Sequence, residues 1–447
     1  MSMGGVFMRV TVLVLVLWVC LVPRSAAAEM CPLGSVEIQD TLDVTATTID
    51  GSVITPTVAY AICLPPHWDG RRALFYAHGT DGDTTLAGIE DQLTLPDGTR
   101  LPDVFVQLGI PFAWLARSDP GLADIQVAIA ELLALQAAFA TRVGPAEFSY
   151  LGGVSQGASI VTRVLESEPT AFDGAVAVCG PIGNFWRQLF RAVDIYNLLD
   201  YFLGAFILER AHVADTERLL TRDDAGGPAI PPSLVARVDA LAGAIVALFT
   251  APTAPERRQI EHFLGVTRLA SRSFYAANAA LVGREIAGLI AEVVTNFNDA
   301  FITLGGHVYN NGSRLYLGSG RDVELNLRIQ RFDPDTSTAR AVIAAFYETT
   351  GALATPLVAP HNLSDPRVPV WHEILYALKA AAAGTAALHS PLPLLRYGHC
   401  NIELPEALAA FVLLVSQVEG HEVAGVSGRL PATPSQELFH ALLSSWR

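Results

Sequence analysis

The sequence predicts an α/β protein in which a mostly parallel central sheet carries helices on both faces and is interrupted by an inserted helical cap. Two observations indicate this class. Short continuous apolar runs, typical of strands buried on both faces, alternate with segments of helical periodicity over residues 73–179 and again over residues 355–419. Between these stretches, nearly every segment of residues 184–304 has helical periodicity. The 447 residues are enough for one large α/β domain with such an insertion.

The expected elements follow in chain order. Residues 35–64 alternate short β-branched runs with turn residues, which predicts antiparallel strands at the start of the sheet. Strands and helices then alternate, with strands expected at 73–77, 109–116, 148–151 and 175–179 and helices at 123–143 and 158–167. After the cap the alternation returns, with strands expected at 355–359 and 388–395 and helices at 369–383 and 403–419. This alternation with short links favours parallel pairing of the strands.

The first residues have the pattern of an export signal rather than of a folded element. Arg9 precedes an apolar run over residues 10–22, which is too short to span a bilayer, and Ala26-x-Ala28 fits a signal-peptidase site. We therefore expect a secreted or periplasmic protein without a membrane anchor in the mature chain. Four segments follow: a signal peptide at 1–28, a first part of the core at 29–183, the helical cap at 184–330, and a second part of the core at 331–447.

The charge balance bears on possible partners. The chain has 29 basic and 44 acidic residues, a net charge of −15 at pH 7. Removal of Arg9 and Arg24 with the signal peptide leaves 27 basic residues against 44 acidic ones, a net charge of −17. Such an excess of negative charge repels phosphate backbones and anionic lipids. We therefore expect neither nucleic acid nor an anionic membrane surface as a partner.

A serine between two glycines is the first candidate for chemistry. Gly153-Val-Ser155-Gln-Gly157 matches the pattern G-x-S-x-G, with the strand before it and the helix after it that this pattern requires. Glycines are needed there because the strand and the helix approach each other closely around the serine. The sequence thus predicts Ser155 as a nucleophile. A glycine-rich turn without chemistry is the alternative.

A nucleophilic serine needs a base, and the base needs an acid that orients it. In proteins with this elbow, the three residues follow the chain order serine, acid, histidine. His399 comes directly after the strand expected at 388–395, and Asp365 follows the strand expected at 355–359. We predict His399 as the base and Asp365 as its acid. An ordinary turn histidine and an ordinary turn aspartate before Pro366 are the alternatives.

The remaining requirement is a pair of N–H groups that bind the oxyanion. Gln156, directly after the nucleophile, is expected to supply one. Thr80, in the loop after the strand at 73–77, is our candidate for the other, with Gly79 as the alternative. We expect His78 to brace this loop. The cap begins with an aromatic-rich helix, in which Phe185 and Trp186 are candidates for lining a substrate pocket, although such a stripe is more often helix core.

These motifs together resemble the α/β-hydrolase superfamily, in its broad esterase, lipase and prolyl-oligopeptidase-like group. The resemblance is carried by YAHGTDG, LGGVSQGAS, NLSDPRVPVWHE and RYGHCNIE, and it covers residues 35–179 and 355–419 but not the cap. The sequence departs from this superfamily at two points. Gln156 stands where many members carry Met or His, and the sequence has no HGGG-type loop. The resemblance implies a serine hydrolase, and we expect neither a cofactor nor a metal.

Four cysteines remain after export: Cys31, Cys63, Cys179 and Cys400. An even number in an exported chain favours two disulfides, for which three pairings exist. We favour Cys31–Cys63, which joins the entry strands. We also favour Cys179–Cys400, because both of these cysteines follow strands at the carboxyl edge of the sheet. Four free thiols are the alternative.

The resulting hypothesis is a secreted carboxylic-ester hydrolase that acts through an acyl-enzyme. Its substrate would be a small or polymeric ester with an apolar or aromatic group, chosen by the cap. A serine peptidase of the prolyl-oligopeptidase-like type, an interfacial lipase and a polyester depolymerase use the same three residues and stay open. A binding protein built on the same fold is a further alternative, which the order Ser155, Asp365, His399 disfavours.

Overall fold

The computed structural model describes residues 30–420, apart from residues 81–83, 120, 123, 214, 215, 217, 225 and 335. The signal peptide predicted at 1–28 lies outside the described residues and stays a prediction, as does everything expected after Gly420. The described residues from Cys31 to Gly420 form one unit.

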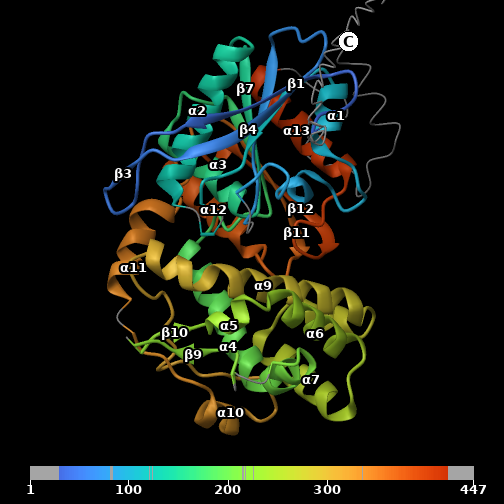
Figure 1. Cartoon of the computed structure of the whole chain (residues 1–447), viewed down its shortest axis with the longest axis vertical. Coiled ribbons are helices and arrows are strands. Elements are labelled where there is room, and N and C mark those ends of the chain that lie inside the picture. The colour runs from blue at the N-terminus through green and yellow to red at the C-terminus, as the bar shows by residue number, and fades with distance from the viewer. Residues whose placement is uncertain are drawn as a thin grey trace, which may run out of the picture. The chain divides into compact units, whose positions relative to one another are not determined.

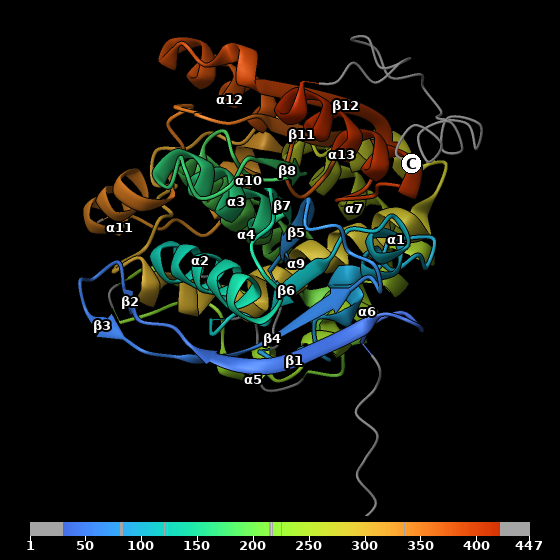
Figure 2. The same ribbon diagram turned by 90° about the horizontal axis from the view of Figure 1, so that it is seen from above.

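An eight-stranded sheet forms the centre of the core (Figure 2). β4 pairs antiparallel with both β1 and β6, and every other neighbouring pair is parallel. The predicted sheet, mostly parallel with antiparallel entry strands, is confirmed. In spatial order its strands are β1 (Val36–Asp43), β4 (Thr57–Leu64), β6 (Phe112–Leu115), β5 (Arg72–Ala77), β7 (Phe148–Val154), β8 (Gly174–Val178), β11 (Leu357–Ser364) and β12 (His389–Tyr397).

Helices cover both faces of this sheet, and this explains the continuous apolar sequences of its inner strands. All four residues of β6 are buried, as is β5 after Arg72. Phe105 and Phe411 pack edge to face on one side of the sheet, with ring centroids 5.0 Å apart. That face carries α1 (Leu101–Gln107) and α13 (Leu404–Glu419), and the other carries α2 (Ile125–Arg142), α3 (Gln156–Ser167) and α12 (Trp371–Ala383) (Figure 2).

The helical segment expected as a cap, residues 184–330, lies beyond one end of the sheet (Figure 1) and is called the cap. The expected helices are present in this part of the chain. The short strands β9 (Thr221–Arg222) and β10 (Pro228–Ala229), which pair antiparallel, are not indicated by the sequence pattern. The helices of the cap are α4 (Phe185–Arg210), α5 (Pro232–Val235), α6 (Val238–Thr250), α7 (Ala254–Thr267), α8 (Ser271–Tyr275), α9 (Ala279–Thr303) and α10 (Asp322–Arg328).

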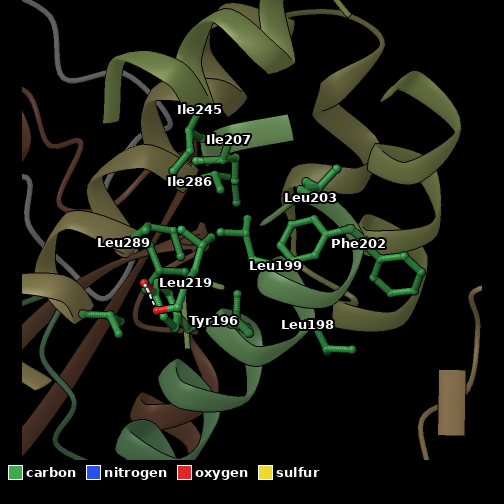
Figure 3. Packing of buried hydrophobic residues seen from close by; sticks show 14 of the residues in the cluster. Tyr196, Leu198, Leu199, Phe202, Leu203, Ile207, Leu219, Ile245, Ile286 and Leu289 are labelled. Carbon is green, nitrogen blue, oxygen red and sulfur yellow. Dashed lines mark hydrogen bonds between the residues drawn. The ribbon is translucent and has the colours of Figure 1, made fainter. Parts of the chain in front are cut away.

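The cap has its own hydrophobic core. Figure 3 shows Tyr196 and Leu199 of α4 packed among side chains that include Ile245 of α6 and Ile286 of α9. The buried Tyr196 hydroxyl donates to the Leu219 carbonyl at 3.1 Å, so its polar atom is satisfied inside this core. Part of the aromatic stripe of α4 therefore forms the interior of the cap.

Two long helices belong to both cores and thereby join the cap to the sheet. Phe185, at the start of α4, packs in the core beside the sheet, whereas Tyr196 packs in the cap. Along α9, Ile286 lies in the cap core and Ala300 in the core beside the sheet. The remaining short elements are β2 (Ala46–Thr47), β3 (Val53–Ile54), α11 (Ser337–Val342), and the single turns η1 (Glu90–Leu93), η2 (Ile343–Tyr347) and η3 (Ala386–Leu388).

Within the described part of the chain, α2 is long and apolar enough to span a membrane, and the bent pair of α6 and α7 meets the same criterion only if taken as one span. The apolar residues of α2 have a place in the core: Leu132, Leu135 and Phe139 are buried among the side chains beside the sheet. Packing against the sheet thus accounts for the hydrophobicity of this helix.

Three strands extend beyond their expected ends, and β7 is one of them, since it reaches Val154 instead of ending at Leu151. β11 reaches Ser364 instead of ending at Ala359, and β12 reaches Tyr397. β11 and β12 stay paired up to Ser364 and Tyr397, with one irregularity after Asn362. The Asn362 side chain is buried, and its amide nitrogen donates to the Gly398 carbonyl at 2.8 Å. This hydrogen bond gives the buried amide nitrogen a partner.

A buried carboxylate ties the end of α13 to the start of β5. The Glu419 side chain is 1% exposed and accepts hydrogen bonds from Arg72 Nη2 at 2.7 Å, Arg71 Nη2 at 2.7 Å and the Tyr150 hydroxyl at 2.9 Å. Burial alone would raise the pKa of Glu419, but the hydrogen bonds from Arg72 and Tyr150 and the guanidinium charges outweigh it and lower this pKa. The folded state therefore favours the ionised carboxylate.

We predict that Glu419→Gln lowers the free energy of unfolding at pH 7 by about 1.5–3 kcal/mol, because the hydrogen bonds from charged donors are weakened. The pKa of Glu419 is lower in the folded than in the unfolded chain, so this stabilisation is present above pH 4.5 and is lost as the pH falls through the folded-state pKa. Urea unfolding from pH 7 to pH 3 measures it. Glu147→Gln, at an exposed pair with Arg71, is the control, and equal losses in the two variants would contradict the prediction.

Candidate active site

Ser155 occupies a strained turn between β7 and α3. Its backbone angles are φ 54° and ψ −117°, a region that residues with a side chain rarely adopt. The flanking glycines make this turn possible. A Cβ on Gly157 would lie 2.1 Å from the Ala77 carbonyl oxygen, and one on Gly153 would lie 2.4 Å from the Gly157 carbonyl oxygen. Only residues without a side chain allow α3 to approach β5 and β7 this closely.

The structure brings Ser155, His399 and Asp365 together at the carboxyl ends of β7, β12 and β11. His399 Nε2 lies 2.9 Å from Ser155 Oγ, and His399 Nδ1 lies 2.7 Å from Asp365 Oδ2. An ionised carboxylate only accepts, so the Nδ1 proton points to Asp365 and Nε2 is left to accept from the serine hydroxyl. The backbone N–H groups of Arg367 and Val368 donate to Asp365 Oδ1 at 2.8 and 2.9 Å and hold this carboxylate in place.

A second histidine, His361, supports the acid loop, and the sequence analysis did not find it. Its Nε2 donates to the Val368 carbonyl at 2.7 Å, and its Nδ1 lies 3.0 Å from Glu373 Oε1. Burial lowers the pKa of His361, but the hydrogen bond and charge of Glu373 and the charge of Asp365 outweigh this and raise it. Its position on β11, four residues before Asp365, is the only sequence signal that could have indicated it.

A buried arginine, Arg117, also missed by the sequence analysis, joins the two parts of the predicted oxyanion site. Its guanidinium donates to the Gly79 carbonyl at 2.7 Å and to Gln156 Oε1 at 2.7 Å. The Gly79 N–H donates to Gln92 Oε1 at 3.2 Å, so it is already in use. Thr80, the next residue, lines the same cavity as Ser155 and Gln156.

His78 lies within hydrogen-bonding distance of this loop. Its Nδ1 is 2.8 Å from the Gly79 carbonyl oxygen. Burial, with a further contribution from the charge of Arg117, holds the pKa of His78 well below its usual value. A neutral imidazole with its proton on Nδ1 donates to this carbonyl.

A cavity of about 140 Å³ lies between Ser155 and the cap. Phe185 is among its lining residues, but Trp186 is not. Neighbouring residues on a helix point about 100° apart, and the Trp186 ring packs instead against the Arg340 guanidinium, 5.3 Å from the ring centroid. The cap supplies the walls through α4 and α9, with Gln188, Leu189, Ala192, Val193, Leu289, Glu292, Val293, Asn296, Phe297, Ala300 and Phe301.

The cap also contacts the two loops that carry His399 and Asp365. The His399 backbone N–H donates to Glu285 Oε2 of α9 at 3.2 Å. Arg367, two residues after the acid, forms ion pairs with Glu285 at 3.5 Å and Glu292 at 2.7 Å. Gly288 lies between these glutamates, and a Cβ there would meet the Arg367 guanidinium at 1.8 Å. One helix of the cap therefore holds both loops.

The two disulfides have the pairing that the sequence analysis favours. Cys31 is joined to Cys63 on β4, with Cα atoms 5.3 Å apart, and Cys179 to Cys400, with Cα atoms 5.5 Å apart. Cys400 directly follows His399, and its Sγ lies 3.4 Å from His399 Nε2. In the described part of the chain, Cys179, His399 and Cys400 form a group with the spacing of metal ligands, but the disulfide uses both sulfurs.

Two features identify the fold: the strand order, in which β4 runs antiparallel to its neighbours β1 and β6, and the serine turn directly after β7. The chain has the α/β-hydrolase fold. No family model and no curated protein matches the sequence.

Several solved structures resemble this chain. Candida antarctica lipase A is 14% identical over 92% of this chain and 86% of that one, with a TM-score of 0.46. Feruloyl esterase B from Aspergillus oryzae is 13% identical over 87% and 88%, also with a TM-score of 0.46. Pyrococcus horikoshii acylaminoacyl peptidase is 10% identical over 90% of this chain but only 44% of that one, with a TM-score of 0.40.

We predict that loss of the Cys179–Cys400 disulfide slows the reaction of Ser155 with a fluorophosphonate more than loss of Cys31–Cys63 does. Only the first disulfide restrains the His399 loop, although each loss costs about 2–4 kcal/mol of stability. The double variants Cys179→Ser with Cys400→Ser, and Cys31→Ser with Cys63→Ser, form a matched pair. Labelling rates measured at a temperature where both variants are folded test the prediction, and equal rates would count against it.

We predict that Glu285→Ala slows the same labelling reaction by about tenfold, because a displaced His399 backbone misplaces the imidazole. Glu285→Gln keeps an oxygen that accepts from the His399 N–H but loses the charge that faces Arg367. It should therefore retain most of the labelling rate. If both variants react as fast as the unaltered protein, the cap does not position the base.

Proposed function

We propose that the protein is an exported carboxylic-ester hydrolase that works through an acyl-enzyme intermediate. The observation that carries the proposal is the hydrogen-bonded series from Asp365 through His399 to Ser155 at the floor of an apolar cavity. Distances of 2.7 and 2.9 Å within this series are those that direct proton transfer requires.

The reaction follows from the position of each proton. His399 Nε2 accepts the hydroxyl proton as Ser155 Oγ attacks the ester carbonyl carbon, and Asp365 stabilises the resulting imidazolium. The imidazolium then donates this proton to the leaving alcohol oxygen, which leaves an acyl-serine. In the second half, His399 takes a proton from water as the water oxygen attacks the acyl carbon. Ser155 recovers its proton, and a carboxylic acid is released.

The oxyanion of each tetrahedral intermediate requires two N–H donors. We assign them to Gln156, whose N–H lies at the N-terminus of α3, and to Thr80. The choice of Thr80 over Gly79 is supported by the hydrogen bond between the Gly79 N–H and Gln92. Arg117 would keep these two segments at a constant separation, because it binds both Gly79 and Gln156.

The cavity favours an ester with an apolar or aromatic group over a peptide. Its walls are mostly aliphatic and aromatic, with Phe185, Phe297 and Phe301 among them. Among the described residues that line it, Glu292 is the one charged side chain, and Arg367 already neutralises it. A charged peptide terminus would therefore find no free counter-charge in this lining.

Export to an oxidising compartment is part of the proposal. It is supported by the two disulfides, which cytosolic thiols would keep reduced, and by the signal-like residues 1–28. Cleavage before Glu29 is the expected processing step. The N-terminal sequence of the protein recovered from the culture medium or periplasm tests it.

We predict that Ser155→Ala and His399→Ala each lower ester turnover by a factor on the order of 10⁴ to 10⁶, because the three residues act as a unit. Asp365→Asn should keep more activity, since it loses the orientation of His399 and the charge that stabilises the imidazolium but keeps the base. Circular dichroism checks that each variant is folded. Normal turnover in Ser155→Ala would overturn the proposal, and normal turnover in Asp365→Asn would require a different acid.

A panel of substrates separates the possible activities. It contains short and long p-nitrophenyl esters, an aryl ester, a polyester film and a peptide amide. We expect turnover of the soluble apolar esters to exceed that of the amide by a wide margin. Preferential cleavage of the amide would favour a peptidase. Activity that rises only above the solubility limit of a long-chain ester would favour an interfacial lipase.

A further inference from the structure

We propose a second binding site, for an organic anion with an apolar body, on the side of α4 that faces away from Ser155. The residues of α4 at 188, 189, 192 and 193 line the cavity above Ser155, whereas those at 187, 190, 191, 194 and 195 line a separate cleft of about 520 Å³. With 3.6 residues per turn, the two sets lie on opposite sides of the helix. The cleft uses none of Ser155, His399 and Asp365, so this inference does not depend on the proposed function.

Positive charge accumulates in this cleft. Four of its lining residues are arginines: Arg187, Arg191, Arg268 and Arg314. Asp194 is the one carboxylate among the described lining residues. A chain with a net charge of −15 thus places four guanidinium groups around a single acid.

That acid is already fully engaged. Asp194 is buried and forms an ion pair with Arg314 at 3.1 Å. Its Oδ1 accepts from the Tyr309 and Tyr316 hydroxyls at 2.9 and 2.6 Å. Its charge offsets that of Arg314 and acts more weakly on Arg191, so a single carboxylate faces four guanidinium groups in the cleft.

Among the described residues, Arg187, Arg191 and Arg268 form no close ion pair with a carboxylate. The charges of Asp365 and Asp194 act on Arg191 from a longer distance. Arg191 donates to the Arg367 and Pro366 carbonyls, both at 2.9 Å, and the Arg187 guanidinium lies 5.2 Å from the centroid of the Trp371 ring. Burial lowers the pKa of Arg191 to about 10, which leaves it charged at neutral pH. Arg187 and Arg191 are four residues apart on one helix, a spacing at which like charges repel. A bound anion would relieve this repulsion.

Apolar side chains at the edge of the cleft indicate the rest of the ligand. Leu315 and Leu317 line the cleft and are 76% and 56% exposed. Trp371 and Phe190 line it beside the arginines. Arginine guanidinium groups bind carboxylates in a planar, two-point geometry. The matching ligand is therefore a carboxylate whose apolar chain or ring covers the exposed leucines.

Calorimetric titration of the whole protein with decanoate tests this site. Two double variants remove the same charge: Arg187→Gln with Arg268→Gln in the cleft, and Arg257→Gln with Arg258→Gln on the exposed surface of α7. We expect the cleft variant to bind decanoate about a hundredfold more weakly, at roughly tenfold for each charged hydrogen bond lost. The α7 variant should bind as the unaltered protein does. Circular dichroism verifies that both variants are folded.

Two further ligands test the contributions of the carboxylate group and of the apolar chain separately. Decanol has the chain without the charge, and acetate has the charge without the chain, so both should bind far more weakly than decanoate. Decanoate could also enter the cavity above Ser155, but that binding persists in both double variants and cancels in their comparison. Equal decanoate affinity of the two variants, or equal affinity for decanol and decanoate, would overturn the proposal. Acetate binding as tight as that of decanoate would overturn the apolar part of the site.

Discussion

The close approach of α3 to β5 is the constraint on which the rest of the site depends. Gly157 packs against the Ala77 carbonyl with no room for a methyl group, and this forces the chain through a positive φ at Ser155. The same approach brings Gln156, at the N-terminus of α3, near the oxyanion loop, where Arg117 links the two segments. His399 follows β12, which is parallel to β7 in the same sheet. Its side chain therefore lies at the same edge of the sheet as Ser155.

The cap does more than cover the site. Its helix α9 lines the cavity above Ser155, accepts the backbone N–H of His399 through Glu285, and binds the loop that follows Asp365 through Arg367. Its helix α4 contacts that loop as well, because Arg191 donates to the Pro366 and Arg367 carbonyls. A shift of either helix would therefore change both the shape of the cavity and the position of the reacting groups.

Several features were predictable because they depend on local patterns. Continuous apolar runs locate the buried strands, and the G-x-S-x-G pattern locates the elbow at Ser155, since only glycines fit there. The chain order of Ser155, Asp365 and His399 selected three residues that the structure brings within hydrogen-bonding distance. The disulfide pairing could also be chosen, because strand order already places Cys179 and Cys400 at one edge of the sheet.

Other features were decided only by tertiary contacts. Arg117 and Glu285 act on residues that lie 39 and 114 positions away, and no local pattern distinguishes them from other polar residues. β11 extends past its apolar run because a contact with Gly398 satisfies Asn362. The adjacent residues Phe185 and Trp186 point in different directions because a helix turns about 100° per residue, so Phe185 lines the cavity and Trp186 packs against Arg340. Local sequence thus determined the strands and the elbow, whereas the partners of each polar side chain depended on which distant segments the fold placed beside it.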